Sequence, residues 1–376
     1  MTRARIGIIG AGFWAVYFYL PFLQRHPEAE IVGVVRRNRE ALEALQRGYG
    51  LEVASSEVDD LLAAGCDGVI VASPHRLHRE HAEAALRAGA HVLIEKPMTV
   101  ALADARALEA EAAKAGKTLT VAHGWNFSRL TTWGADAIAS GAIGEPRWIT
   151  GVMSSSLVDL FSGTSGYGSV EVGGYSFEAQ AETWADPGAG GGYVYGQLSH
   201  ELGVALALVP AEPRLVFARA GFLPNGVDID VVVSVEFEDG VVGSFAGHGR
   251  APWGVRYPLE LRVAGEAGVL TLDFEHDTAE LWRGSSSVSS DELSEGEQSF
   301  RGKAPDLELD LEPGAGLYSC DGPAQFLVDR CLGRDGIDRA PAELGRRAVA
   351  IMEAAVRSAR SGHPVAVEDL EAGGRA

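Results

Sequence analysis

Residues 5–15 read RIGIIGAGFWA, an apolar run that ends at two closely spaced glycines. The run RIGIIG has the length of a strand, and Gly10, Gly12 and Ala15 match the pattern G-x-G-x-x-G/A. In this pattern the first glycine permits a tight turn, the second lets the backbone approach a pyrophosphate, and the third, small residue lets a helix pack closely on the strand. Free N–H groups at the start of that helix attract the anion. The stretch therefore predicts a dinucleotide-binding unit, and the alternative is a glycine turn without a ligand.

The first 124 residues alternate strand-length apolar runs with stretches of helical periodicity. The expected strands are residues 5–10, 30–36, 68–73, 91–97 and 118–124. Such alternation predicts βαβ units and a parallel sheet, and runs that are apolar on both faces indicate helices on both sides. We therefore predict an α/β protein whose residues 1–124 form a doubly wound, dinucleotide-binding Rossmann domain.

The rhythm changes after residue 124. A helix-like stretch and one strand precede a glycine-rich region, residues 159–192, that lacks a helical period. Several strand-like runs follow, separated by the hairpin signals EDG and GEAG. Residues 284–316 resemble an exposed loop, and a final helix is expected at about 342–361. Residues 125–376 are thus predicted to form an α+β domain with an antiparallel meander, for substrate binding and oligomer contacts.

The composition excludes several classes of protein. A formal net charge of -20 repels phosphate backbones, which argues against a nucleic-acid partner. No stretch of 18 or more apolar residues occurs, so no membrane span is expected. The three cysteines include no CxxC pair, and neither HxxxH nor HExxH occurs, so we expect no disulfide framework and no metal site. These features suit a cytoplasmic protein.

The end of the second expected strand bears on the choice of dinucleotide. An acid there binds the ribose 2′-hydroxyl of NAD, whereas arginine accommodates the 2′-phosphate of NADP. This chain has Arg36, Arg37 and Asn38 at that point. The two guanidinium groups favour NADP. NAD remains the alternative if both arginines are solvated surface charges.

Several further motifs carry a family resemblance over nearly the whole chain. They are GIIGAGFWA (7–15), ASPHRLH (72–78), EKPMTV (95–100), GKTLTVAHGWNFSR (116–129), GAIGEPRWI (141–149) and GGG…H (190–200). With these the chain resembles the glucose–fructose oxidoreductase / inositol dehydrogenase (Gfo/Idh/MocA) family, and EKP is the most specific of them. The resemblance implies a Rossmann domain followed by a domain with a large open sheet.

The resemblance also implies roles for individual residues. Lys96 of EKP reaches the substrate hydroxyl that is oxidised, in agreement with the rule that open α/β sheets bind ligands beyond the carboxyl ends of their strands. A cis bond is implied before Pro97. The alternatives are a surface lysine at a strand end and surface histidines at a helix start. The expected cofactor-binding residues are Gly10, Gly12, Phe13, Trp14, Arg36, Arg37, Ser73, His75, His78, Glu95 and Lys96.

The second-domain motif of this family departs from its usual form, GGG-x-x-x-D-x-G-x-H-x-x-D. Here the glycines and His200 are present, but Gly196 and Gly203 replace the two acids. Gln197 offers an amide to a sugar hydroxyl, yet an amide does not accept a proton. His200 and Lys96 are therefore the only acid/base pair that we assign, and a packed helix histidine is the alternative for His200.

Candidate substrate-binding residues follow the expected strand 118–124 and lie in the aromatic-rich loop. Trp125, Asn126 and Arg129 enter the second domain at the expected cleft edge. Tyr167, Tyr175 and Trp184 are placed to stack on sugar faces, or equally to pack the loop or an oligomer contact. The full expected set is Lys96, Trp125, Asn126, Arg129, Trp184, Gln197 and His200.

These features together predict an NAD(P)-dependent oxidoreductase. Hydride would pass between nicotinamide and a secondary hydroxyl or ketone of a sugar, glycoside or cyclitol, with His200 moving the proton and Lys96 binding the same oxygen. The alternatives are a redox-neutral, glycoside-processing enzyme with tightly bound NAD, and a non-catalytic dinucleotide-binding protein. Apolar strands such as DIDVVVSVEF favour a homodimer or homotetramer.

Overall fold

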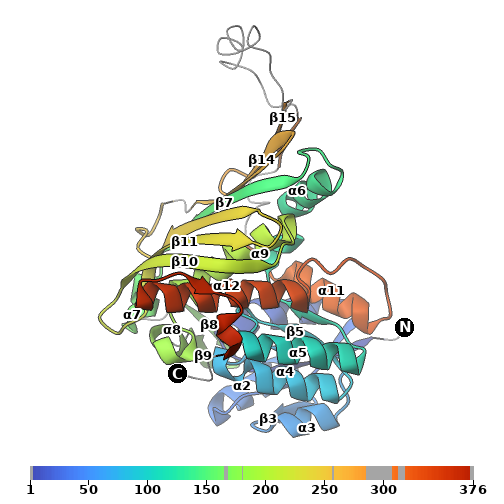
Figure 1. Cartoon of the computed structure of the whole chain (residues 1–376). Coiled ribbons are helices and arrows are strands. Elements are labelled where there is room, and N and C mark those ends of the chain that lie inside the picture. The colour runs from blue at the N-terminus through green and yellow to red at the C-terminus, as the bar shows by residue number, and fades with distance from the viewer. Residues whose placement is uncertain are drawn as a thin grey trace, which may run out of the picture.

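The computed structural model describes residues 3–164, 168–179, 181–255, 258–284, 307–311 and 318–372. The described residues form two large sheets, with helices between and around them, and one two-stranded hairpin (Figure 1). The smaller sheet is built from the N-terminal part of the chain and the larger sheet from the remainder.

The N-terminal sheet is six-stranded, with strand order β3-β2-β1-β4-β5-β6 and every pair parallel. Its strands are β1 (Ala4–Ile9), β2 (Ala29–Val35), β3 (Val53–Ser55), β4 (Gly68–Val71), β5 (His91–Ile94) and β6 (Leu119–Val121). The order reverses between β1 and β4, which is where ligands bind in open α/β sheets. The predicted Rossmann arrangement is confirmed, and the short edge strand β3 is additional to the expected strands.

Helices cover both faces of this sheet, because its strands are buried on both sides. The glycine turn after β1 leads into a π-helical turn, η1 (Ala15–Tyr19), which continues as α1 (Leu20–Arg25). The other helices of this part are α2 (Arg39–Tyr49), α3 (Val58–Ala63), α4 (His78–Arg87) and α5 (Leu102–Ala115).

The second sheet is nine-stranded, with order β16-β15-β14-β13-β7-β12-β11-β10-β17. Its neighbours are antiparallel except for the parallel pair β7 and β12, so the predicted open, mainly antiparallel sheet is confirmed. The strands are β7 (Pro146–Ser154), β10 (Pro213–Phe222), β11 (Asp228–Phe237), β12 (Val242–His248), β13 (Leu259–Gly265), β14 (Gly268–Asp273), β15 (Thr278–Arg283), β16 (Leu307–Asp310) and β17 (Val365–Ala366).

Three helices pack on the inner face of the second sheet: α6 (Arg129–Ala139), α9 (Ser199–Leu208) and α12 (Ala342–Ser361). Almost every residue of α9 is buried, because α9 lies between the sheet and the other helices. One of them, Glu201, is fully buried beside Gly151 of β7, and burial raises the pKa of this carboxyl well above 4.5. The final helix has the bounds that the sequence predicts.

Helix α12 joins the two parts of the molecule. It packs on β10 and α9 of the second part and on α5 of the first. The Glu353 carboxylate accepts a hydrogen bond from the Leu102 N–H, 2.7 Å, at the N-terminus of α5, which has no side-chain cap of its own. The Arg346 guanidinium donates to Glu109 of α5 and to Glu212 before β10. One helix thereby fixes the position of the first sheet relative to the second.

Two predictions about the second part of the chain need correction. The glycine-rich region 159–192 contains ordered elements: α7 (Val158–Ser162), the hairpin β8 (Ser169–Val172) and β9 (Tyr175–Glu178), and α8 (Glu182–Ala185). The loop expected at 284–316 lies largely outside the described residues, yet β16 falls within it.

An additional helix, α11 (Asp321–Cys331), follows residue 124 in the chain but packs on the first sheet. Leu327 and Val328 of this helix join Ile6, Ile70 and Leu93 in one buried cluster. We retain residues 1–124 and 125–376 as the proposed division along the chain, with α11 as a contribution of the second part to the core of the first.

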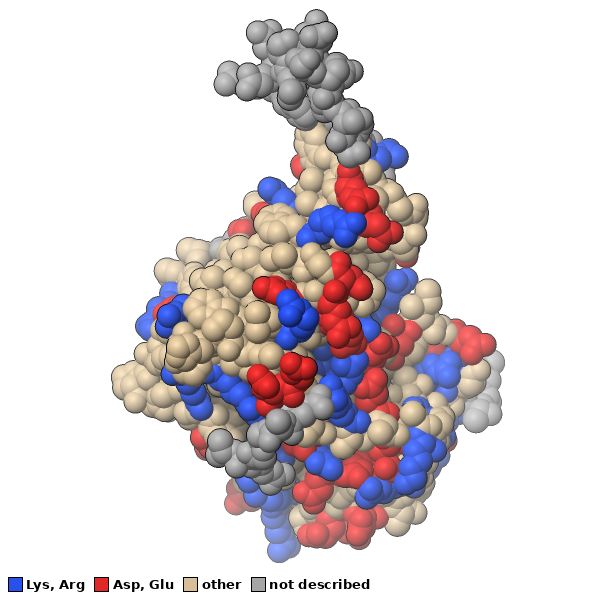
Figure 2. Space-filling model, in the orientation of Figure 1, with Lys and Arg blue, Asp and Glu red and all other residues tan. Residues whose placement is uncertain are grey.

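In the part of the chain that the structure describes, the outer face of the second sheet has an exposed apolar area around β7, β11 and β12. Trp148 and Val152 of β7, Val232 of β11 and Val242 of β12 point outward, with 39 to 54% of each exposed. Val242 is paired with Trp148, and Val152 and Val232 both pair with Ala246. Figure 2 shows charges of both signs interspersed over the helices in its lower half, whereas the area over β7 and β11 is mainly uncharged. No helix within the described residues is long and apolar enough to cross a membrane.

Candidate active site

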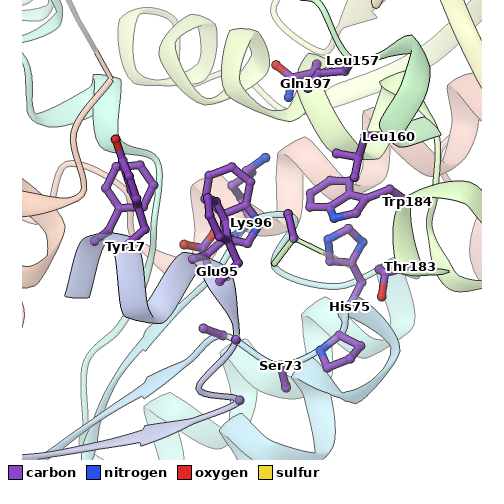
Figure 3. Close-up of a pocket in the computed structure, with 18 of the residues that line it drawn as sticks. Tyr17, Ser73, His75, Glu95, Lys96, Leu157, Leu160, Thr183, Trp184 and Gln197 are labelled. Atoms are coloured by element: carbon purple, nitrogen blue, oxygen red, sulfur yellow. The ribbon is translucent and has the colours of Figure 1, made fainter. Parts of the chain in front are cut away.

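A cavity of about 1590 Å³ lies between the carboxyl ends of the first sheet's strands and the inner side of the second part. The N-terminal part contributes the turn after β1 and the loops after β2, β4 and β5. The second part contributes the end of β7, the β8–β9 hairpin, and the segments around α8 and α9. Figure 3 shows Lys96 and Glu95 in the middle of this cavity, with His75 and Trp184 side by side and Gln197 farther away.

The glycine turn leaves room for a ligand's phosphates. Gly10 has φ +90°, and a Cβ on it would lie 2.4 Å from the Ser73 backbone, so only glycine fits there. A Cβ on Gly12 would meet nothing nearer than the Arg36 guanidinium at 3.7 Å, because this residue faces the open cavity. Phe13 and Trp14 follow and also line the cavity. These residues fit a dinucleotide whose pyrophosphate approaches the turn.

The two arginines after β2 have different surroundings. Arg36 donates from Nη1 to the Ala11 carbonyl, 2.7 Å, and its guanidinium carbon lies 5.2 Å from the centre of the Phe177 ring. Arg37 is exposed at the rim of the cavity. Asn38 accepts a hydrogen bond from the Ala41 N–H as the N-cap of α2. The Arg36 guanidinium is therefore held in place by Ala11 and Phe177, whereas Arg37 is an exposed cation at the rim of the cavity.

Ser73, His75 and His78 follow β4 and are buried, so a surface role for these two histidines is wrong. His78 brings Nδ1 to 2.9 Å from the Pro97 carbonyl and Nε2 to 2.8 Å from the Ser73 carbonyl. Burial lowers the pKa of His78 to about 4, and a neutral imidazole donates to only one of the two carbonyls. His78 therefore lies between the loops that follow β4 and β5 and contacts both of them. His75 lies 3.1 Å from the Gly190 carbonyl, its ring edge-on to Trp184.

Lys96 is 8% exposed and lies at the end of β5. Its Nζ donates to the Gly196 carbonyl, 2.7 Å, and lies 5.3 Å from the centre of the Trp184 ring. The Lys96–Pro97 bond is cis. Burial lowers the pKa of Lys96 to about 8, although the neighbouring Glu95 opposes that shift. Lys96 is consequently a cation that loses its proton near neutral pH rather than a surface lysine.

Glu95 is held behind Lys96 by the first helical segment of the chain. The Tyr19 hydroxyl donates to Glu95 Oε1, 2.6 Å, and the Lys96 backbone N–H donates to Oε2, 3.1 Å. Burial raises the pKa of the Glu95 carboxyl, while the positive charge of Lys96 lowers it. Tyr19 is a supporting residue that no sequence motif singles out, since it lies in an apolar helical stretch.

His200 lies at the start of α9, 6% exposed, and lines the same cavity. Its ring packs edge-on against Trp125 and Tyr318, with ring centres 5.0 and 4.9 Å away. His200 Nδ1 has no hydrogen-bond partner among the described residues. Burial, then the charge of Lys96, lowers the pKa of His200 well below 6.5, so its imidazole is neutral at pH 7. His200 therefore contributes a neutral imidazole to the wall of the cavity.

Neighbouring rings occupy the space beside both glycines that replace acids in the family motif. A Cβ on Gly196 would lie 3.0 Å from the Phe161 ring and 3.1 Å from the Trp184 ring. A Cβ on Gly203 would lie 2.6 Å from His123 Nδ1. Burial lowers the pKa of His123 to about 3, so its imidazole is neutral and occupies the space beside Gly203. Sequence patterns did not identify His123, because it contacts a glycine that is far away in the chain.

The structure places only some of the remaining candidate substrate-binding residues at the cavity. Trp125, Trp184 and Gln197 line the cavity. Asn126 does not, because it is fully buried and its amide donates to the Gly203 and Arg339 carbonyls. Arg129 is exposed at the start of α6, away from the cavity. These two expected substrate contacts are therefore wrong.

The aromatic-loop candidates have separate outcomes. Tyr175 packs with the β8–β9 hairpin outside the cavity lining, and Tyr167 lies outside the described residues. The three serines that end β7, Ser154 to Ser156, line the cavity, and the SSS run after an apolar strand was the overlooked signal. Within the described residues no group of three or more His, Cys, Asp or Glu side chains is arranged to hold a metal ion.

Comparison with known proteins agrees with this geometry. A family model described as "Oxidoreductase family, NAD-binding Rossmann fold" matches residues 4–123, and one described as "GFO/IDH/MocA C-terminal domain" matches residues 135–271. A 1,5-anhydro-D-fructose reductase of Ensifer adhaerens is 32% identical over 247 residues, which are 64% of this chain and 68% of the relative.

Two further similarities extend the comparison. A 1-carboxy-3-chloro-3,4-dihydroxycyclo hexa-1,5-diene dehydrogenase of Comamonas testosteroni is 29% identical over 213 residues, 56% of this chain, and the match spans about half (48%) of that relative. The fold is shared with the crystal structure of GenD2 from gentamicin A biosynthesis in complex with NAD. That structure has a TM-score of 0.72 and 21% identity, over 97% of both chains.

The contact between His123 and Gly203 makes a testable prediction. In a helix, Gly→Ala normally stabilises by up to about 1 kcal/mol. Gly203→Ala should instead destabilise by about 1–3 kcal/mol, because its Cβ overlaps the His123 ring. In a His123→Ala background the same substitution should become stabilising. Thermal unfolding midpoints of the four proteins measure this, and stabilisation by Gly203→Ala in both backgrounds would contradict the packing described.

Proposed function

The chain belongs to the Gfo/Idh/MocA family of NAD-binding oxidoreductases, and from this premise we propose that it acts on a secondary hydroxyl or ketone. The substrate class we propose is a sugar, glycoside or cyclitol. The carrying observation is that Lys96 from the first part and His200 from the second, both buried, line one cavity beyond the carboxyl ends of the parallel strands. The named activities of the reductase and dehydrogenase relatives support this class.

The residues around the cavity have separate roles in the proposed reaction. The bound nicotinamide supplies the hydride chemistry, as a cofactor does in this class of reaction. The Lys96 ammonium hydrogen-bonds the substrate oxygen and stabilises negative charge that develops on it. The neutral imidazole of His200 takes that oxygen's proton during oxidation and returns it during reduction. The serines at the end of β7 and Gln197 are placed to bind further hydroxyls.

The cofactor we propose is NADP in preference to NAD, on the basis of the arginine pair after β2. Arg36 is already engaged by Ala11 and Phe177, so it supports the adenosine end of either cofactor. Arg37 is exposed at the cavity rim, where a 2′-phosphate would lie in the family arrangement.

The first prediction concerns catalysis. With NADP and NAD against a panel of sugars, cyclitols and glycosides, absorbance at 340 nm should show turnover. Lys96→Ala and His200→Ala should each lower kcat about 10²–10⁴-fold while cofactor still binds. Arg129→Ala is the matched control and should match wild type, because Arg129 lies outside the cavity. Near wild-type kcat in both cavity variants would refute the assignment.

The pH profile should report Lys96. With its pKa near 8, Lys96 is protonated below that pH and neutral above it. Loss of the ammonium as pH rises through about 8 should slow reduction, because reduction needs the ammonium at the carbonyl oxygen. Oxidation passes through the same transition state, so it should slow over the same range. His200 should add no limb above pH 6.5, because burial keeps it neutral there.

A second prediction separates the two arginines. Arg37→Ala should raise Kd for NADPH about tenfold or more and leave NADH unchanged, because a charged hydrogen bond contributes about 1.5–3 kcal/mol. Arg36→Ala should weaken the binding of both cofactors, since it removes the guanidinium that lies between Ala11 and Phe177. Fluorescence titrations give all the constants. A wild-type preference for NADH, or an equal effect of Arg37→Ala on both cofactors, would reject the phosphate role.

We also propose that the outer face of the second sheet forms a homodimer or homotetramer contact, because Trp148, Val152, Val232 and Val242 leave it apolar. Val232→Asp should convert the assembly to monomers in sedimentation equilibrium. Ile337→Asp, at an exposed position away from the sheet, should not change the assembly. A monomeric wild-type protein would remove the proposal.

A further inference from the structure

The β8–β9 hairpin belongs to the second part of the chain but is packed against the first. Phe177 of β9 is fully buried in the cluster that contains Ala41 and Leu45 of α2. Val170 and Val172 of β8 pack on the same cluster. Figure 1 shows the two strands next to α2. The contact therefore crosses between the two parts of the molecule at the side of the cofactor cavity.

The turn of the hairpin fits closely against α2. Gly173 has φ +57°, and a Cβ on it would lie 2.2 Å from the Ala44 carbonyl oxygen. The Gly173 carbonyl accepts hydrogen bonds from Arg47 Nη2 at 2.9 Å and from Arg47 Nε at 3.3 Å. The neighbouring Gly174 has φ +81°, and a Cβ on it would meet no atom within 4 Å. Only the first of these two glycines is needed for docking.

The opposite side of the hairpin forms part of the cavity wall. Ser169, Glu178 and Ala179 line the cavity together with Gly12 and Phe13 of the phosphate turn. The segment closes on itself here, because the Ala179 N–H donates to the Gly168 carbonyl at 3.2 Å. A Cβ on Gly168 would lie 3.6 Å from the Phe13 ring. The base of the hairpin therefore lies beside the glycine turn in the cavity wall.

The hairpin also holds the Arg36 side chain in place. The Phe177 ring faces the Arg36 guanidinium, whose carbon lies 5.2 Å from the ring centre, and the Tyr175 ring packs edge-on against Phe177. Arg36 in turn donates to Ala11 in the glycine turn. A continuous set of contacts thus runs from the hairpin through Arg36 to the turn that receives the pyrophosphate.

We propose that the β8–β9 hairpin is a clasp that closes the adenosine end of the dinucleotide site, and that the cofactor leaves only after the hairpin separates from α2. The proposal rests on the proposed function only in requiring that a dinucleotide occupies the cavity. It makes Phe177, with Tyr175 packed against it, a positioning residue for cofactor binding that acts through Arg36. It adds a release step controlled by a contact outside the reacting groups.

The test compares the two glycines of the turn. In Gly173→Ala the new Cβ cannot fit against Ala44, so bound NADPH should be released about tenfold faster or more. In Gly174→Ala the backbone strain is similar but the space is open, so release should stay close to the wild-type rate. Release is measured by chasing bound NADPH with excess NADP in a stopped-flow fluorimeter.

A second readout needs no cofactor. Amide hydrogen exchange in the strands Ser169–Val172 and Tyr175–Glu178 should accelerate in ligand-free Gly173→Ala and not in Gly174→Ala. Arg47→Ala removes the two hydrogen bonds to the turn without touching the cavity, and should also accelerate both exchange and release. If Gly173→Ala does not fold, Arg47→Ala decides the question.

The outcomes separate the clasp from the proposed function. Faster hydrogen exchange with an unchanged NADPH release rate would overturn the clasp and leave the oxidoreductase assignment intact. Equal release rates for Gly173→Ala and Gly174→Ala would also overturn it. Failure of the wild-type protein to bind NADPH or NADH would refute the proposed function itself.

Discussion

A buried ammonium group has to be hydrogen-bonded, and Lys96 satisfies this requirement across the boundary between the two parts of the chain. Its bond to the Gly196 carbonyl joins the end of β5 to the turn that leads into α9. The same contact fixes the distance between the parallel sheet and the helix that carries His200. Trp184 covers the ammonium, and Glu95 behind it supplies the opposite charge. The site therefore depends on one cation that both parts of the molecule must enclose.

The fold was largely predictable, because local patterns and tertiary structure agree in most elements. The strands of the first sheet are buried on both faces, and α12 has apolar residues at helical spacing, so their sequences show them directly. The β8–β9 hairpin was not predicted, because its glycines interrupt both the strand and the helix periodicity of the sequence. Its contacts with α2 hold it in place. Helix α11 was missed for a similar reason: the first sheet that it covers is formed by residues far away in the chain.

The site was predictable where a motif fixes both the residue and its direction. Lys96, His75 and Trp184 line the cavity as expected, and the motifs supplied the positions of the first two. Asn126 and Arg129 failed because their place after β6 does not determine which way they point. Asn126 instead holds α9 through the Gly203 carbonyl. His123 could not be found from the sequence, since its role depends on a glycine that is distant in the chain and has no side chain.

Two helices near the C-terminus have a consequence for biosynthesis. Helix α11 completes the core of the first sheet, and α12 caps α5 through Glu353. Both helices are translated long after the first sheet, because α11 begins 200 residues after the end of β6. N-terminal segments generally fold first during synthesis, but here the first sheet keeps an apolar surface exposed until α11 has been synthesised. The core of the first sheet is therefore completed only after most of the second part of the chain has been made.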